Sequence, residues 1–128
     1  MIAYSASCQI VIAPNTQIKG LNSALITFTG DFTNNSNEAD FSKTYFHLVG
    51  TDQDLTNGTT GSATTLGGLI VGMKDSTHNG IINFNGGDWE IADSLVFNDG
   101  IVIPQSTKII YTIPNGNLGK VVVNKNNT

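Results

Sequence analysis

Apolar and polar positions alternate along several short segments of the chain. In "LITFTGDF" (25–32), Ile26 and Phe28 have one parity and threonines occupy the positions between and after them. In "IINFNGGDW" (81–89), Ile82 and Phe84 alternate with asparagines in the same way. Such alternation is typical of a strand with one face on the core and the other in water. No window of eleven residues has a helical period, so the pattern predicts an all-β chain.

The β-rich runs recur at intervals of about ten residues, with Gly and Asn at the breaks, which is typical of a sandwich or barrel. We expect one all-β domain or module over residues 1–128, folded as an antiparallel β-sandwich of the jelly-roll or Ig-like kind. The alternative is a β-solenoid. The predicted strands are Gln9–Ala13, Gln17–Gly20, Ala24–Thr29, Ser42–Val49, Leu66–Met73, Ile81–Asn85, Trp89–Ala92, Leu95–Asn98, Ile101–Ile103, Lys108–Ile113 and Lys120–Asn124.

The same parities predict the core. Trp89 shares its parity with Ile91, so we place it in the core, whereas Tyr45 alternates with Phe46 and is expected to be exposed. The predicted core comprises Ile10, Ile12, Ile18, Ile26, Phe28, Phe46, Leu48, Ile70, Ile82, Phe84, Trp89, Leu95, Phe97, Ile101, Ile103, Ile110 and Val122.

One phrase occurs twice: "IVIAPNTQIKG" (10–20) returns as "IVIPQSTKIIY" (101–111). Each consists of a β-branched run, a proline, a polar turn and a second apolar run. Proline cannot donate to a strand ladder and keeps the residue before it extended, so it marks the end of a strand. A weaker pair is "ITFTGDF" and "INFNGGDW". We interpret both repeats as backbone shape without chemistry, and because their offsets differ we favour the sandwich over the solenoid.

Two polar stretches interrupt the pattern. Residues 33–40 form a polar connection, and residues 51–68 form either a long exposed loop or a hairpin that turns at Asn57 and Gly58. Loops of that length in a compact domain are usually functional or disordered. Asp52, Asp54 and Asn57, with nearby Tyr45, are therefore the candidate ligand or assembly residues.

Calcium is the only cofactor with any support in the sequence. The segment "DQDLTNG" begins like an EF-hand loop, but Asn57 stands where the loop needs Gly and Ala63 stands where it needs Glu. The EF-hand motif therefore fails, and only a looser calcium site on Asp52, Asp54 and Asn57 stays open.

No motif predicts catalysis. His47 and His78 lack the spacing of a metal pair, and no GxSxG segment is present. The carboxylates, among them Glu38 and Glu90, lie beside turn residues or strand ends. We expect a protein that is not an enzyme, with no catalytic, cofactor-binding or metal-binding residue. For Cys8, burial, a disulfide between subunits and a reactive thiol all stay open.

Composition and charge narrow the partners and the location. The formal net charge is −4, the six basic residues are scattered lysines, and charged residues make up 12%, so we expect no nucleic-acid partner. The sequence contains no run of eighteen apolar residues, so no membrane span is predicted. The first residues contain neither a basic segment nor a long apolar run, so no signal peptide is predicted, and the export route stays open.

The phrases "IVIAPNTQIKG", "ITFTGDFTNNSN" and "LVFNDGIVIPQSTKIIY" resemble the Asn/Thr/Gly-rich β-modules of large surface and adhesin-like proteins of Bacteroidetes. The type IX secretion system exports those proteins, and their modules stack as β-sandwich or β-solenoid units. The resemblance covers about half of the chain, consists of turn-and-strand patterns, and brings no catalytic motif with it. It implies an extracellular location.

These observations predict a structural, self-assembling β-module of an extracellular filament, a cell surface or a virion. Its partners would be copies of itself or neighbouring subunits that pair with edge strands near the two ends of the chain. The alternative function is a glycan-binding adhesin module that uses the 51–68 segment and Tyr45, with carbohydrate as the partner.

Overall fold

The computed structural model describes residues 9–72, 80–98, 101–103, 109–111 and 120–123. The prediction of an all-β chain is confirmed. The predicted antiparallel sandwich is wrong, because every strand pair in the described residues is parallel and the strands form a β-solenoid of about four turns. The structure adopts the alternative, the solenoid, although the irregular repeat offsets favour a sandwich.

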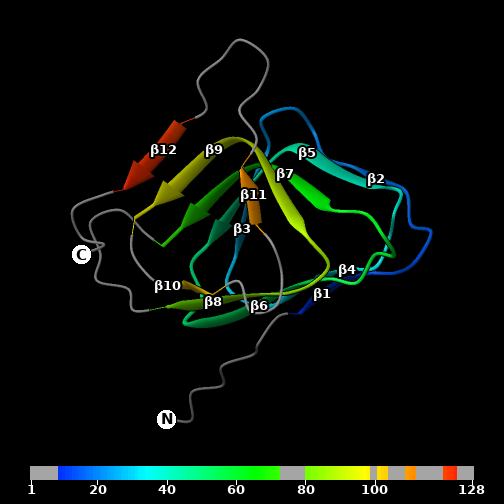
Figure 1. Ribbon diagram of the computed structural model, residues 1–128, viewed down its shortest axis with the longest axis horizontal. Helices are drawn as coiled ribbons and strands as arrows, with labels where there is room; N and C mark the ends of the chain where they lie inside the picture. Colours follow the sequence, from blue (N-terminus) through cyan, green and yellow to red (C-terminus); the bar gives the residue numbers. More distant parts are fainter. Residues whose placement is uncertain (1–8, 73–79, 99–100, 104–108, 112–119, 124–128) are drawn as a thin grey trace, which may run out of the picture.

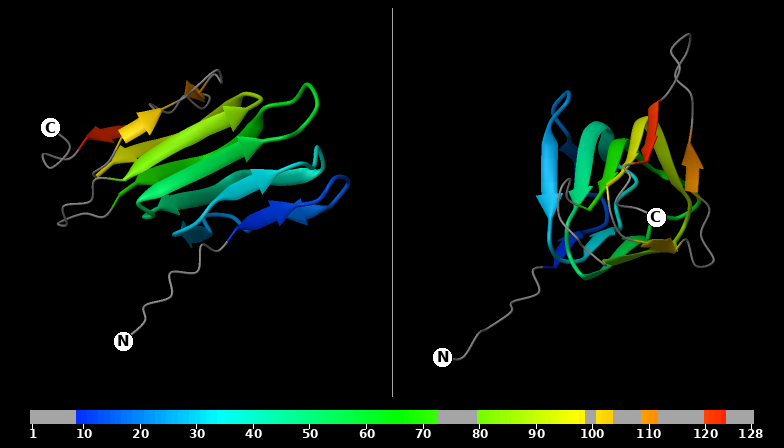
Figure 2. Two further views of the ribbon diagram at one scale, coloured as in Figure 1. Left: turned by 90° about the horizontal axis from the view of Figure 1, so that it is seen from below. Right: turned by 90° about the vertical axis from the view of Figure 1, so that its left-hand side faces the viewer.

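Two parallel sheets enclose the core. The first sheet has the order β1-β4-β6-β8-β10, and the second has the order β11-β9-β7-β5-β2, with β3 paired to β5 and β12 paired to β9. Figure 1 shows the second sheet bending over the first, and Figure 2 shows the strands side by side in chain order. The first sheet contains β1 (Ile10–Ile12), β4 (Phe32–Asn34), β6 (Asp52–Asn57), β8 (Ile81–Gly86) and β10 (Ile101–Ile103). The second contains β2 (Ile18–Lys19), β3 (Leu25–Phe28), β5 (Ala39–Leu48), β7 (Thr64–Val71), β9 (Trp89–Phe97), β11 (Ile109–Tyr111) and β12 (Lys120–Val123).

Each coil passes once through the first sheet and once through the second, so equivalent strands of successive coils lie in parallel register. In the first sheet Ile10, Phe32, Leu55 and Phe84 are consecutive partners, which gives coil lengths of 22, 23 and 29 residues. The sequence repeats therefore have irregular offsets although the backbone repeats regularly. Unequal turns between the strands absorb the difference.

The doubled phrase marks the first and last coils. Its first runs are β1 and β10 in the first sheet, and its second runs are β2 and β11 in the second sheet. Pro14 follows β1 in a turn, as predicted, and Asn15 there has a φ of 60°. Pro104 and Pro114 lie outside the described residues. The weaker pair of phrases is not equivalent in space, because one leads from β3 into β4 and the other from β8 into β9.

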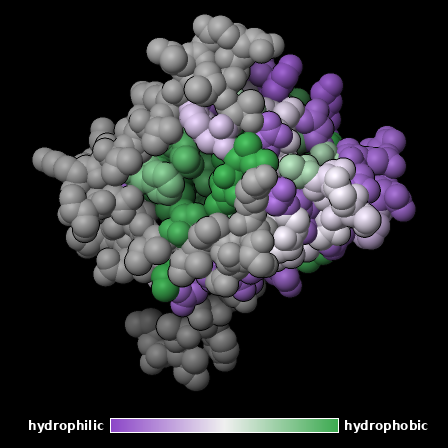
Figure 3. Space-filling view, in the orientation of Figure 1, coloured by the Kyte–Doolittle hydropathy of each residue, from purple (hydrophilic) through white to green (hydrophobic). Residues whose placement is uncertain are grey.

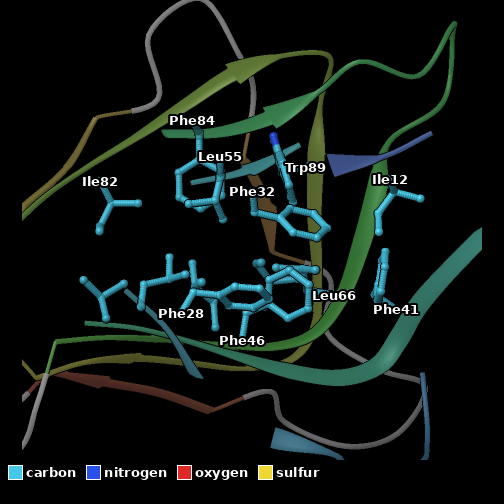
Figure 4. Packing of buried hydrophobic residues seen from close by; sticks show 14 residues of the cluster. Ile12, Phe28, Phe32, Phe41, Phe46, Leu55, Leu66, Ile82, Phe84 and Trp89 are labelled. Carbon is cyan, nitrogen blue, oxygen red and sulfur yellow. The ribbon is translucent and has the colours of Figure 1, made fainter. Parts of the chain in front are cut away.

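Rows of apolar side chains from the two sheets meet inside the solenoid (Figure 4). Phe32 on β4 packs against Phe46 on β5 with ring centroids 5.0 Å apart, and Phe28 packs against Phe46 at 4.7 Å. Phe84 meets Trp89 edge-on at 5.2 Å. Such pairs contribute about 0.5–1.5 kcal/mol each beyond the area they bury. The Phe32–Phe46 and Phe84–Trp89 contacts thus join the two sheets, whereas the Phe28–Phe46 contact joins neighbouring strands of the second sheet.

Most of the predicted core is correct, and the exceptions among the described side chains are Ile10, Ile26 and Ile70. Ile10 and Ile26 are 38% and 37% exposed because the first coil has described strands on only one side. Ile70 is half-buried and lies in the outward row with His47. Buried as predicted are Ile12, Phe28, Phe46, Leu48, Ile82, Phe84 and Trp89, and partly buried are Ile18, Leu95, Phe97 and Ile110. The side chains of Ile101, Ile103 and Val122 lie outside the described set.

Two strands, β4 and β6, were not predicted. Both lie in stretches interpreted as polar connections, because several of their inward positions are polar: Asn34, Gln53 and Asn57 are almost completely buried. The 51–68 stretch is therefore neither a loop nor a hairpin at Asn57. It holds all of β6 and the first part of β7, joined by a short connection that leads from the first sheet to the second.

Asn34 and Asn57 are partners in adjacent strands, and each closes the corner that follows its strand. The Asn57 side-chain amide donates to the carbonyls of Ser62 (2.9 Å) and Asp88 (2.7 Å), and its oxygen accepts from the backbone N–H of Thr59 at 3.0 Å. Asn34 accepts from the backbone N–H of Ser36 in the same way. The two asparagines thus satisfy backbone groups that the corners would otherwise leave buried and unpaired.

Replacing Asn57 with alanine should lower the free energy of unfolding by about 2–4 kcal/mol, because several buried backbone groups lose their partners. Urea unfolding followed by circular dichroism measures the change. The control is Thr56→Ala, which alters the neighbouring half-buried, outward-facing side chain and should change stability by about 0.5 kcal/mol or less. Equal losses in the two variants would show that Asn57 has no special role at the corner.

Candidate functional site

The structure does not bring the four candidate residues together. Asp52 and Asp54 are exposed on the outer face of β6, while Asn57 is buried on the inner face. Tyr45 lies on β5 in the other sheet. Asp54 contacts its own neighbours: its backbone N–H donates to Asp31 Oδ1 at 2.9 Å, and its carboxylate accepts from Asn83 Nδ2 at 3.1 Å.

The predicted calcium ligands are thus divided between the two faces of one strand. Within the described part of the chain, no group of three or more His, Cys, Asp or Glu side chains is placed to hold a metal ion. Of the two histidines, His78 lies outside the described residues, and His47 is half-buried with Nε2 2.7 Å from the carbonyl oxygen of Gly72. Cys8 also lies outside them.

The described carboxylates are dispersed over the outer surface, and several have polar partners of their own. Gln17 donates to Glu38 at 2.8 Å, beside a hollow between β2 and β5. Asp40 accepts from the hydroxyl and the backbone N–H of Ser42, and these two hydrogen bonds lower its pKa.

Tyr45 occupies the most developed polar site. Its ring lies against Gly68 of β7, where an added Cβ would collide with the ring. Its hydroxyl reaches past β7 and donates to the Asp93 carboxylate on β9. The hydroxyl of Tyr111 donates to the Asp93 carbonyl at 2.9 Å. We predict an exposed Tyr45, but the residue is half-buried, because Gly68 has no side chain and the Tyr45 ring packs directly against its backbone.

The surroundings of Tyr45 change the pKa of its phenol group. The hydrogen bond to the Asp93 carboxylate raises the pKa of Tyr45, and partial desolvation and the negative charge of Asp93 act in the same direction. A hydrogen bond with Ser94 opposes the change. The neutral phenol is the form that can donate to Asp93. Because the folded-state pKa is raised, the contribution of this bond to stability is complete below about pH 10 and is lost as the pH rises through the folded pKa.

A second candidate site lies at the beginning of the solenoid. An apolar cavity of about 190 Å³ opens at the first coil between the two sheets. The strands that border it carry exposed apolar side chains: Val11 is 52% exposed and Leu25 is 58% exposed. Figure 3 shows the opposite end of the solenoid, nearest β11 and β12, where hydrophobic residues lie at the centre and hydrophilic residues lie toward the right edge. The lining residues are Ile10, Ile12, Ile18, Ile26, Phe28, Phe32, Phe41 and Phe46.

Sequence reasoning missed most of both sites. The apolar end could not be predicted from the sequence, because Ile10 and Ile26 have the parity of ordinary core residues. Only the order of the coils shows that they lie at an end. Asp93 was interpreted as a turn residue. The one available signal was the pair of adjacent glycines in "TTLGGLIVG", since glycine within a strand marks a close approach of another group.

Comparison of the chain with family models, with curated proteins and with solved structures gives no match. Among the described residues there is no helix with the length and hydropathy needed to cross a bilayer.

Titration of the tyrosines tests the Tyr45 site. In a pH titration of absorbance near 295 nm, one component should ionise above the usual tyrosine range, and Tyr45→Phe should remove it. Asp93→Asn should shift this component toward the usual pKa, because the carboxylate charge is lost. Asp54→Asn, on the other sheet, is the control and should leave it unchanged. Identical curves for the wild type and Asp93→Asn would contradict the assignment.

Proposed function

We propose that the chain is a structural β-solenoid module that associates with copies of itself, end to end, through its terminal coils. The observation that carries the proposal is the apolar first coil. There a cavity opens whose described lining consists of aliphatic and phenylalanine side chains, and Ile10 and Ile26 are more than a third exposed.

The backbone edge supports the same function. Within the described strands, β1, β2 and β3 each pair on one side only. Proteins usually protect such edges with charged residues, proline or bulges. Here β1 and β3 have the sequences IVI and LITF, which contain no charge and no proline, and only β2 carries a charge, on Lys19. An added strand would gain both the backbone hydrogen bonds and the apolar contacts.

The symmetry of the solenoid favours a head-to-tail contact. All described strand pairs are parallel, so the last coil of one copy would continue both sheets in parallel register by stacking on the first coil of the next. The first and last coils also share the IVI sequence, in β1 and β10 of the same sheet. A contact between two different ends generates a ring if its rotation closes and a filament if it does not, and coils that stack in one continuous parallel series give the filament.

The surface composition is the basis for the proposed location. Only 12% of the residues are charged, and Asn, Thr, Ser and Gly are abundant. Such a composition suits a β-rich protein of an extracellular filament, a cell surface or a virion. The described carboxylates are scattered over the outer face and several bond to local amides or hydroxyls, as Glu38 and Asp54 do, which supports a role that is not enzymatic. A second candidate, a glycan-binding adhesin module, is favoured by a hollow of about 300 Å³ on the outer face of the second sheet, lined by Tyr45, Lys43 and Asp93 among others.

A charge placed at the apolar end should abolish association. Ile26 lies at the opening on β3 and is partly exposed, so Ile26→Lys should fold and remain monomeric, because a desolvated ammonium would be costly in the stacked contact. Thr27→Lys is the matched control, since Thr27 lies on the outer face of the same strand. Sedimentation velocity over a concentration series and negative-stain microscopy measure the outcome.

Wild-type protein and Thr27→Lys should form oligomers or filaments that lengthen with concentration. A wild-type protein that stays monomeric at every concentration would contradict the proposal. So would an Ile26→Lys variant that folds, by circular dichroism, and assembles like the wild type.

A further inference from the structure

The second sheet has a notch on its outer face, which results from unequal coil lengths. Between the paired positions Phe41–Leu66 and Tyr45–Gly68, β5 contains residues 42 to 44 and β7 contains only residue 67. Between Leu66–Ile91 and Gly68–Ser94, β9 contains residues 92 and 93. The strands on both sides of β7 thus contain extra residues at this level, and several of these residues line a hollow there. Bulges of this kind are common where a sheet presents side chains to a ligand.

The floor of the notch is backbone, because β7 has adjacent glycines there. A Cβ on Gly67 would lie 2.8 Å from the carbonyl carbon of Lys43, and one on Gly68 would collide with the Tyr45 ring. Glycine within a strand weakens the strand, so two in succession indicate that close approach of other groups is required. The result is a hollow of about 300 Å³, near the lower end of the range for small-molecule sites.

The walls of the notch are polar and come from three coils. The corner of the first coil supplies Asn22 and Ser23, the bulge of β5 supplies Ser42 and Lys43, and the bulge of β9 supplies Asp93. Within the described residues, the side chains of Asn22, Ser23 and Lys43 make no hydrogen bond with other protein groups, so an amide, a hydroxyl and an ammonium remain available for a ligand.

The aromatic wall is fixed in place. Contact with Gly68 and the hydrogen bond from its hydroxyl to Asp93 hold the Tyr45 ring, so little side-chain entropy remains to be lost on binding. The same bond orients the Asp93 carboxylate, which is exposed.

These groups together define the ligand chemistry. One ammonium and one carboxylate give the notch no formal net charge, which disfavours a strongly charged ligand. Hydroxyl and amide groups can both donate to and accept from the hydroxyls of a ligand, whereas the ammonium donates and the carboxylate accepts. An aromatic ring offers an apolar surface beside them. A pyranose ring has this combination of features: hydroxyls around its rim and an apolar face of C–H groups.

We propose that this notch binds a neutral hexopyranose unit of a glycan, with Tyr45 packed against its C–H face and Asn22, Lys43 and Asp93 bonded to its hydroxyls. The site and the Ile26 contact use different faces: the notch lies on the outer face of the second sheet, and association uses the open end of the first coil, to which Asn22 and Ser23 also belong. A glycan could therefore decorate or anchor an assembly without taking part in its formation.

The test is a titration of ¹⁵N-labelled protein, observed by ¹H–¹⁵N correlation spectra, with the methyl glycosides of glucose, galactose, mannose and N-acetylglucosamine. At least one sugar should bind with a dissociation constant on the order of 1 mM, as expected for a single small ring. Shifts should concentrate at Asn22, Lys43, Gly67, Gly68 and Asp93. Ile26→Lys protein should give the same result, which separates this inference from the end-to-end association.

Two notch variants and one control make the test decisive. Asn22→Ala removes an exposed amide and Tyr45→Leu removes the ring while keeping an apolar side chain over Gly68, and each should weaken binding at least tenfold. Thr56→Ala, on the first sheet, should bind like the wild type. The inference is overturned if no sugar produces shifts, if the shifts fall elsewhere, or if folded Asn22→Ala and Tyr45→Leu bind as tightly as the wild type.

Discussion

Backbone hydrogen bonds between successive parallel coils are the interaction on which the rest of this structure depends. They require every strand to lie in register with the equivalent strand one coil earlier, as Phe32 does with Ile10 and Leu55 does with Phe32. Register in turn fixes which side chains form the inner rows. An inward-facing side chain in this fold therefore has two kinds of neighbour: its register partners in the adjacent coils and the side chains of the opposite sheet.

That constraint is hardest to meet at the corners, where strands end and backbone groups lose their partners. The chain meets it with buried side chains that imitate the backbone. Gln53 donates to the carbonyls of Phe28 and Gly30 and accepts from the N–H of Gly50 at 2.6 Å, so it joins two coils at one corner. Asn34 and Asn57 do the same at the other corner. Gly86, with a φ of +79°, lies so close to Asn57 that a Cβ would collide with its carbonyl oxygen.

The same polar interior explains what the sequence could and could not predict. Strands whose inward positions are apolar, such as β3 and β8, follow simple alternation and were predicted closely. β6 was missed because Gln53 and Asn57 point inward, so it has the pattern of a polar loop. Parallel pairing was missed because the inserted residues fall in turns and bulges, which hides the coil period of 20 to 29 residues.

The candidate sites depend on neighbours that are distant in the chain, and no local pattern contains that information. Tyr45 was identified as a candidate from its parity, but its partner Asp93 lies 48 residues away on β9. The open end of the first coil consists of residues with ordinary core character, and only their position in the stack leaves them exposed. Local propensity thus predicts the strands, whereas the order of the coils determines where a ligand or a second copy could bind.

The central claim is the parallel stacking of coils, and backbone nuclear Overhauser effects test it most directly. On the outer face of the first sheet, Val11, Thr33, Thr56 and Asn85 form one continuous row of register partners. A parallel solenoid predicts cross-strand contacts that connect these four residues in that order. Close Hα–Hα contacts between neighbouring strands, which antiparallel pairs produce, or contacts that break this order, would contradict the account.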